Sequence, residues 1–177
     1  LDLGCGDGRL LRYLRETKGV VGYGVEIDHE RVLGCIRNDV DVIQIDIERG
    51  LSGFEDHSFD HVIISQALQA MHATERILGE MLRVADEAVV SFPNFAYQTN
   101  RQAIASGHMP VSEDLPYEWY DTPNVRFFTI ADFEELCDKL GIEVRERLAF
   151  DDAGQPVADD PNLNGSLAFY RLGRKPA

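Results

Sequence analysis

The sequence has few basic residues and no long apolar run. Seventeen Lys and Arg stand against 31 Asp and Glu, which leaves a formal net charge of −14 at pH 7. A general nucleic-acid binder or a protein of an anionic membrane surface needs a basic face, so this balance argues against both classes. No apolar stretch approaches the ~20 residues that a membrane-spanning helix requires.

Cysteine is scarce as well. The three cysteines, Cys5, Cys35 and Cys137, are odd in number, widely spaced and outside any CxxC pair. This pattern is typical of thiols that serve as small core residues in a reducing cytoplasm. His57 and His61 are four residues apart on a loop that enters a strand, and they lack a companion ligand, so we predict no metal site.

The remaining composition is that of an ordinary globular domain. The chain has 177 residues, of which 44% are hydrophobic and 27% charged, and this length is typical of one domain. It opens at Leu1 without an initiator Met, in what reads as the tail of a strand. We therefore expect a single domain over residues 1–177 whose first strand is truncated at its start.

Apolar runs alternate with helical patterns along the chain. We expect strands at residues 1–3, 20–26, 40–45, 59–65, 88–92, 142–150 and 167–172. Strands that alternate with helices predict a mostly parallel sheet covered on both faces. Only a loop joins the last two strands, whereas a parallel crossover needs a dozen or more residues and usually includes a helix, so the last strand is expected to be antiparallel. The prediction is a doubly wound, Rossmann-like α/β fold with seven strands in a mixed sheet.

Four segments carry the apolar spacing of a helix. Their expected buried positions are Leu10, Leu11 and Leu14; Val32, Cys35 and Ile36; Ile77, Leu78, Met81, Leu82 and Ala85; and Phe133, Leu136, Cys137 and Leu140. Asp28 is placed to cap the second of these helices. Thr129 with Asp132 resembles a capping box for the fourth, and Gly141 supplies its stop.

A glycine-rich turn, Asp2–Gly8, follows the first strand. Glycines permit a tight turn and let a ligand approach the backbone. A dinucleotide fingerprint has its third glycine three places after the second, where this chain has Arg9. No Gly-Lys-Ser/Thr triplet follows either, so the turn favours a ligand without a pyrophosphate.

These residues resemble the class I S-adenosylmethionine-dependent methyltransferases. In that family an acid at the end of the second strand holds the ribose hydroxyls, and another follows the third strand beside the adenine; Glu26 and Asp46 occupy these places. Carboxylates accept hydrogen bonds from hydroxyls, amines and the cofactor's ammonium group, so Asp2 can also accept a hydrogen bond from the cofactor. The resemblance implies a site for S-adenosylmethionine or S-adenosylhomocysteine formed by Asp2, Gly4, Cys5, Gly6, Glu26, Ile27, Asp46, Ile47 and Ser65. The alternative is that a glycine turn and three acids occur in any α/β protein.

No catalytic residue is assigned. Methyl transfer needs chiefly alignment, with a base where the acceptor is protonated. His72, after the fourth strand, is a candidate base, although a histidine beside a helix more often has no catalytic role. No Gly-x-Ser-x-Gly elbow is present, so a serine hydrolase is unsupported.

Residues 94–126 form an insert rich in aromatic residues and proline, without clean periodicity. Between Val111 and Thr122 it carries four acids and no Lys or Arg. One interpretation is a local cap on the sheet edge. We favour a lid or a docking face, because long loops are often functional and Tyr and Trp supply large contact areas.

The insert and its flanking residues indicate a particular family within the class I methyltransferases. The chain is similar to the methionine-biosynthesis protein MetW family at Ser91–Phe95, Gly107–Pro110, Leu115–Asn124 and Thr129–Phe133. This resemblance implies a cytoplasmic protein that acts with a homoserine O-acyltransferase. Three hypotheses stay open: a cofactor-binding accessory protein of methionine synthesis, an active methyltransferase on a small-molecule acceptor, and a purely structural interaction module.

Overall fold

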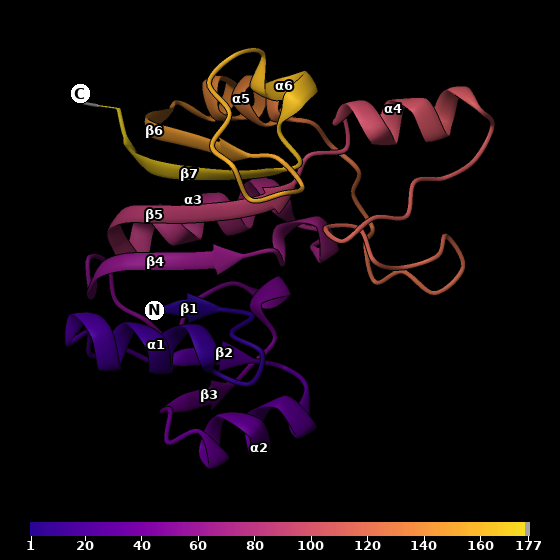
Figure 1. Ribbon diagram of the computed structural model, residues 1–177. Helices are drawn as coiled ribbons and strands as arrows, with labels where there is room; N and C mark the ends of the chain where they lie inside the picture. Colours follow the sequence, from indigo (N-terminus) through magenta and orange to yellow (C-terminus); the bar gives the residue numbers. More distant parts are fainter. Residues whose placement is uncertain (176–177) are drawn as a thin grey trace.

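A seven-stranded sheet forms the centre of the molecule in the computed structural model, which describes residues 1–175 (Figure 1). The strand order is β3-β2-β1-β4-β5-β7-β6, and β7 runs antiparallel to both of its neighbours while the other pairs are parallel. This confirms the predicted mixed sheet. The strands are β1 (Asp2–Leu3), β2 (Gly24–Glu26), β3 (Val42–Gln44), β4 (Phe59–Ser65), β5 (Ala85–Pro93), β6 (Ile142–Phe150) and β7 (Leu167–Arg174).

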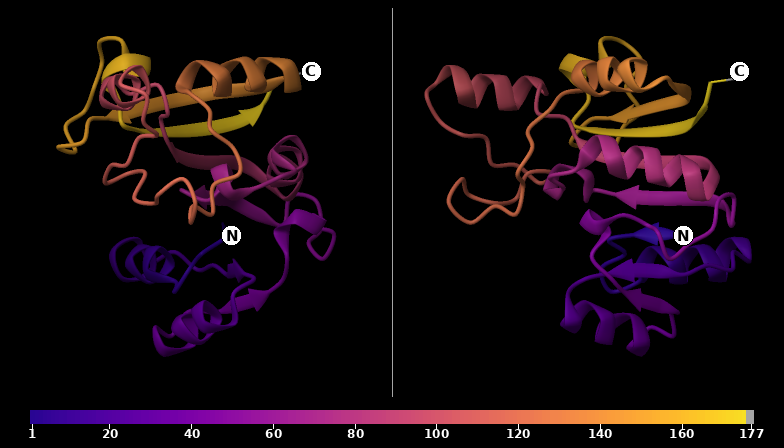
Figure 2. Two further views of the ribbon diagram at one scale, coloured as in Figure 1. Left: turned by 90° about the vertical axis from the view of Figure 1, so that its right-hand side faces the viewer. Right: turned by 180° about the vertical axis from the view of Figure 1, so that it is seen from behind.

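Helices cover both faces of the sheet. Figure 2 shows α1 and α2 on one face and α3 and α5 on the other. Over residues 1–175 no helix is long and apolar enough to cross a membrane. The helices are α1 (Arg9–Lys18), α2 (His29–Arg37), α3 (Thr74–Val84), α4 (Gln98–Ala105), α5 (Ile130–Leu140) and α6 (Pro161–Asn164), with 3-10 turns η1 (Ile47–Arg49) and η2 (Leu68–Ala70).

The core lies between the sheet and the pair α3 and α5. The predicted stripe of α3 is buried at Ile77, Leu78, Met81 and Leu82, and each such side chain contributes roughly 1.5–3 kcal/mol when removed from water. An aromatic cluster joins β5, β7 and α5. In it Phe92 packs on Phe133 and Phe133 on Tyr170, each with ring centroids 4.8 Å apart.

The predicted helix caps are confirmed. The Asp28 side chain accepts a hydrogen bond from the Arg31 N–H at the start of α2. Thr129 and Asp132 form a complete capping box before α5, and Gly141 ends that helix with φ of 68°. These local devices fix where the two helices begin or end.

The structure differs from expectation in four places. β2 begins at Gly24 rather than at Val20, and Val21 is 95% exposed. Ile36 is 63% exposed because α2 packs only through a small cluster around Cys35. Ala85 opens β5 instead of closing α3, and the insert contains the helix α4, which its polar sequence did not predict.

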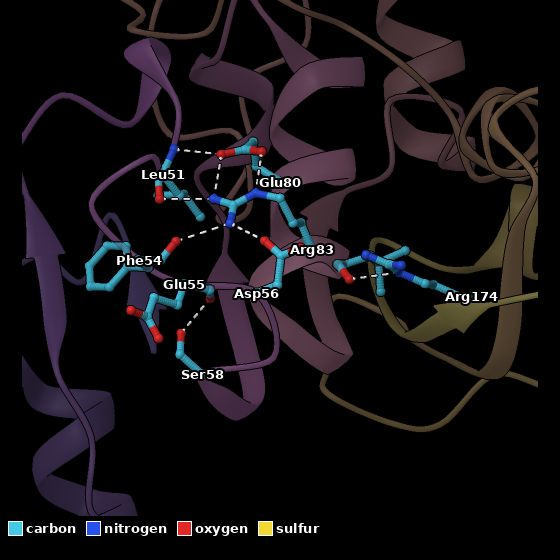
Figure 3. A network of polar contacts seen from close by, with 9 residues as sticks. Leu51, Phe54, Glu55, Asp56, Ser58, Glu80, Arg83 and Arg174 are labelled. Atoms are coloured by element: carbon cyan, nitrogen blue, oxygen red, sulfur yellow. Dashed lines mark hydrogen bonds and ion pairs between the residues drawn. The ribbon is translucent and has the colours of Figure 1, made fainter.

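Arg83 anchors the polar loop between β3 and β4 onto α3 (Figure 3). Its guanidinium donates to the carbonyls of Leu51 and Phe54, both at 3.0 Å, and to the carboxylates of Asp56 and Glu80, both at 2.7 Å. Glu80 also accepts from the Leu51 N–H at 2.9 Å. The network satisfies loop carbonyls that strand pairing leaves free.

Candidate ligand pocket at the carboxyl ends of the strands

A cavity of about 500 Å³ opens at the carboxyl ends of the parallel strands. In open α/β sheets this edge is where ligands bind. Its wall combines the turn after β1, the ends of β2 and β3, the segment after β4 and part of the insert. Lining residues include Gly4, Glu26, Ile27, Arg31, Asp46, Ile47, Glu48, Gln66, Gln69, Met71, His72, Asp114, Tyr117 and Asn124.

The glycine turn has the geometry that only glycine tolerates well. Gly4 and Gly8 have φ of 68° and 80°, in the left-handed region. A Cβ on Gly8 would lie 3.0 Å from the Cβ of Val40, so side-chain bulk is excluded as well. The N–H groups of Gly4 and Cys5 both donate to the Val25 carbonyl, which holds the turn against β2.

Glu26 is buried at the end of β2 and organises two loops. One carboxylate oxygen accepts from the N–H of Ile27 at 2.8 Å and of Asp28 at 2.9 Å, and the other accepts from the Gly6 N–H at 3.0 Å. A carboxylate offers about four acceptor sites. These contacts leave capacity on the oxygen that faces the glycine turn.

Asp2 is a buried carboxylate without a donor. It is 2% exposed, and no side chain or backbone N–H among residues 1–175 donates a hydrogen bond to it. Burial raises the pKa of Asp2 to about 7; the Leu1 amino group opposes this rise, and the neighbouring Glu26 carboxylate adds to it. Asp2 lies behind the wall rather than in it. A carboxylate with so little exposure is costly to ionise unless water or a ligand supplies a donor.

Asp46 and Ile47 lie where β3 ends. The Asp46 side chain caps η1 by accepting from the Glu48 N–H at 3.0 Å, and Ile47 is buried in the wall. Ile27, which follows Glu26, is 60% exposed and offers an apolar surface at the rim. The structure therefore brings the predicted ribose and adenine residues to one cavity.

Three other predicted residues stand behind the wall with Asp2. The Gly6 N–H is used by Glu26, and the Ser65 hydroxyl lies 3.1 Å from that of Ser91. The Cys5 sulfur lies 3.7 Å from the sulfur of Cys35, and burial raises the pKa of both thiols. Any contact from these three to a ligand would be made by the backbone or by a rearranged side chain.

Several wall residues were not predicted. Glu48 accepts hydrogen bonds from the N–H groups of His72 and Ala73; although burial opposes ionisation, these bonds lower the pKa of Glu48. Its place two residues after Asp46 could have indicated it. The His72 ring nitrogen Nδ1 lies 3.4 Å from Glu48, and the His72 side chain is 72% exposed at the rim.

Gln69 ties the insert to the pocket. Its carbonyl accepts from the N–H groups of Val125 and Arg126 at 3.0 and 2.9 Å, and its side-chain Oε1 is buried without a partner among the described residues. Asp114, Tyr117 and Asn124 of the insert line the same cavity. No local pattern in the sequence indicated Gln69, because its role comes from long-range contacts.

A second and larger cavity of about 700 Å³ lies beside the first, and His72 lines both. Phe127, Phe128, Phe133 and Leu136 give it an apolar wall. None of the predicted cofactor residues lines it. The smaller cavity is therefore the one that matches the sequence pattern.

Comparison with known proteins agrees with this architecture. Residues 1–172 match the model of the family described as methionine biosynthesis protein MetW. The bifunctional methionine biosynthesis protein MetXA/MetW of Rhodopirellula baltica is 39% identical over 190 residues, which cover 98% of this chain and 30% of that protein. The chain thus spans less than a third of this relative's length.

Solved structures of low identity share the fold. A S-adenosylmethionine-dependent methyltransferase of Thermotoga maritima is 20% identical with a TM-score of 0.71, covering 98% of this chain and 80% of that one. A counterpart of Mesorhizobium loti is 16% identical with a TM-score of 0.72, covering 98% and 89%. The [4+2]-cyclase SpnF is 19% identical with a TM-score of 0.70, covering 99% and 75%. The fold is that of class I methyltransferases, but a cyclase shares it, so the fold alone does not determine activity.

Proposed function

Because the chain belongs to the MetW family of methionine biosynthesis proteins, we propose that it binds S-adenosylmethionine and acts together with a homoserine O-acyltransferase. The observation that supports this ligand is the buried negative charge beside the glycine turn, where Asp2 stands behind the cavity wall. Asp2 is 2% exposed and has no donor among the described residues, so its carboxylate favours a ligand that brings a cationic group to the neighbouring cavity, such as the cofactor's ammonium.

The other wall residues fit the rest of this cofactor. Glu26 has a free acceptor site for a ribose hydroxyl, and Asp46 with Ile47 offers an acceptor and an apolar surface for the adenine. Gly4, which has a positive φ and no side chain, leaves the backbone beside these residues accessible to the ligand. When bound, the cofactor supplies an activated methyl group; the residues of this chain bind and orient it.

An accessory role is favoured over turnover. The one histidine among the described wall residues, His72, is 72% exposed and hydrogen-bonded through its backbone to Glu48 and Arg126. Methyl transfer to a protonated acceptor needs alignment and a base, and an imidazole this exposed is not shielded from water for that task. These features favour a protein that binds the cofactor and signals its presence to a partner protein.

The partner is suggested by the MetXA/MetW relative, whose name pairs a second methionine-biosynthesis protein with the part that this chain matches. We take MetXA to represent the acyltransferase that the family resemblance implies. The tip of the insert offers a docking face: Trp119 and Tyr120 are each 70% exposed and pack edge to face with ring centroids 5.7 Å apart. Exposed aromatic side chains of this kind commonly anchor interfaces.

The test is the acyltransferase activity measured with and without this protein, in the presence and absence of S-adenosylmethionine, together with a sizing-column assay for a complex. We expect a complex and a change in activity. The double variant Trp119→Ala/Tyr120→Ala should lose both. Tyr13→Ala is the matched control, because Tyr13 is 60% exposed on α1, away from the insert. No complex and no change in activity with the unaltered protein would contradict the partnership.

An active small-molecule methyltransferase is the second candidate, favoured by the position of His72 beside both cavities. Incubation with methyl-labelled S-adenosylmethionine and a metabolite pool separates the two functions. A labelled product that disappears in His72→Ala supports the enzyme. Binding of the cofactor without a labelled product supports the accessory role.

A further inference from the structure

The wall of the cavity has an excess of negative charge. Glu26, Asp46, Glu48 and Asp114 contribute four carboxylates, whereas Arg31 contributes the one guanidinium among the described lining residues. A ligand cation gains from this field, and a neutral ligand of the same shape does not. The wall therefore discriminates by charge as well as by shape.

The strand order sets the order in which residues follow one another along the cavity. β3, β2, β1 and β4 lie side by side in that order, with neighbours about 4.8 Å apart. Asp46 follows β3, Glu26 ends β2 and Gly4 follows β1. With the adenine at Asp46 and the ribose at Glu26, as the proposed function has them, the sulfur of the cofactor lies farther along, toward β4 and the insert.

Asp114 lies at that far end. It accepts a hydrogen bond from the Ser166 hydroxyl, and the Ser166 carbonyl accepts from the Asn94 N–H at 2.7 Å directly after β5. Asp114 is half-buried, and the buried neighbour Leu115 fixes the local turn through hydrogen bonds with Ser112. The carboxylate is therefore held in place before any ligand arrives.

We propose that Asp114 is a charge-specificity residue that makes the pocket favour the sulfonium form, S-adenosylmethionine, over the neutral thioether S-adenosylhomocysteine. This inference rests on the proposed function. A fixed carboxylate on the sulfur's side of the cavity stabilises the cofactor that still carries its methyl group. Because the sulfur loses its charge as the methyl departs, such stabilisation favours the bound ground state over the transition state. A preference of this kind is expected of a protein that senses the cofactor in its methylated form.

The experiment is a calorimetric titration at low ionic strength with three ligands: S-adenosylmethionine, S-adenosylhomocysteine, and sinefungin, which has an ammonium group in place of the sulfonium. A carboxylate about 10 Å from a unit charge changes affinity by roughly tenfold at an effective dielectric constant of about 20. We expect the two cationic ligands to bind about tenfold more tightly than the neutral one.

Asp114→Asn should weaken both cationic ligands about tenfold and leave S-adenosylhomocysteine unchanged. Glu113→Gln is the matched control: it makes the same charge change at the adjacent, exposed position, which does not line the cavity. It should leave all three affinities unaltered. A thermal melt verifies that each variant is folded, and the comparison of ligands on the unaltered protein tests the charge preference without any variant.

Two results would overturn the proposal. One is equal or tighter binding of S-adenosylhomocysteine by the unaltered protein. The other is an equal loss for all three ligands in Asp114→Asn, which would assign Asp114 a purely structural role through Ser166. If none of the three ligands binds, the proposed function itself fails, and that outcome is distinct from both.

Discussion

Asp2→Asn is expected to stabilise the fold at alkaline pH while weakening binding of the cofactor. The folded state buries the Asp2 carboxylate to 2% exposure without a donor, and burial raises its pKa from 3.8 to about 7. Asparagine has the same shape and no charge to desolvate. The substitution therefore removes a cost of folding and, with it, the negative charge proposed to attract the ligand's ammonium group.

The sign and size follow from proton linkage. Between pH 3.8 and about 7 the folded state keeps the Asp2 proton while the unfolded chain has lost it, so stability falls as the pH rises through this window. At 1.36 kcal/mol per pH unit the full interval corresponds to roughly 4 kcal/mol. Relaxation and water entry reduce such penalties in real proteins, so we expect a gain of about 2 kcal/mol at pH 8 and almost none at pH 4.

Urea unfolding at the two pH values measures this gain, and calorimetry measures the affinity for S-adenosylmethionine. Asp7→Asn is the matched control in the same turn, because Asp7 is partly exposed and paired with Arg9 at 2.8 Å. It should not gain stability at pH 8. An Asp2→Asn variant that gains equally at both pH values, or gains nothing at pH 8, would refute the reasoning about burial. Unchanged affinity would refute the role of Asp2 in binding.

Three further substitutions test the cofactor site and the framework around it. Glu26→Arg should weaken cofactor binding by about 2–4 kcal/mol, since it removes a hydrogen-bonded carboxylate, and unaltered calorimetric affinity would show that the ribose assignment is wrong. Arg83→Ala should lower the free energy of unfolding by about 2–3 kcal/mol, because it frees two loop carbonyls and the carboxylate of Glu80; a loss under 0.5 kcal/mol by urea titration would contradict the anchoring role. Thr129→Ala should cost about 1 kcal/mol through loss of the capping box, and an unchanged melting curve would argue that α5 does not need the cap.

Local chemistry was sufficient for much of the fold. The bounds of β4 and β6 agree with the apolar runs, and the start of α5 agrees with the Thr129–Asp132 spacing, because each depends on residues close in sequence. The antiparallel last strand followed from a connection in which the sequence shows no helix of the kind that a parallel crossover usually contains. The glycine turn could be predicted because closely spaced glycines are required by few backbone conformations other than a tight turn.

By contrast, which strands pair and which helix faces pack could not be predicted from residues close in sequence. Val20–Tyr23 has the composition of a strand, yet β2 pairs with both β1 and β3 only from Gly24 onward, so the preceding residues have no ladder and remain outside the sheet. Ile36 has helical spacing but no packing partner on its side of α2. A propensity is realised only where a neighbour exists to pack against or pair with.

The sequence by itself determined the alternation of strands and helices, the glycine turn, and the acids that follow β2 and β3, because each depends on residues adjacent along the chain. The tertiary structure alone decided that Asp2 is buried without a donor and that Gln69 holds the end of the insert. It also brought Asp114 into the wall, more than 60 residues from Asp46 in the chain. Burial and long-range hydrogen bonds depend on which strands become neighbours, and that order exists only once the sheet has assembled.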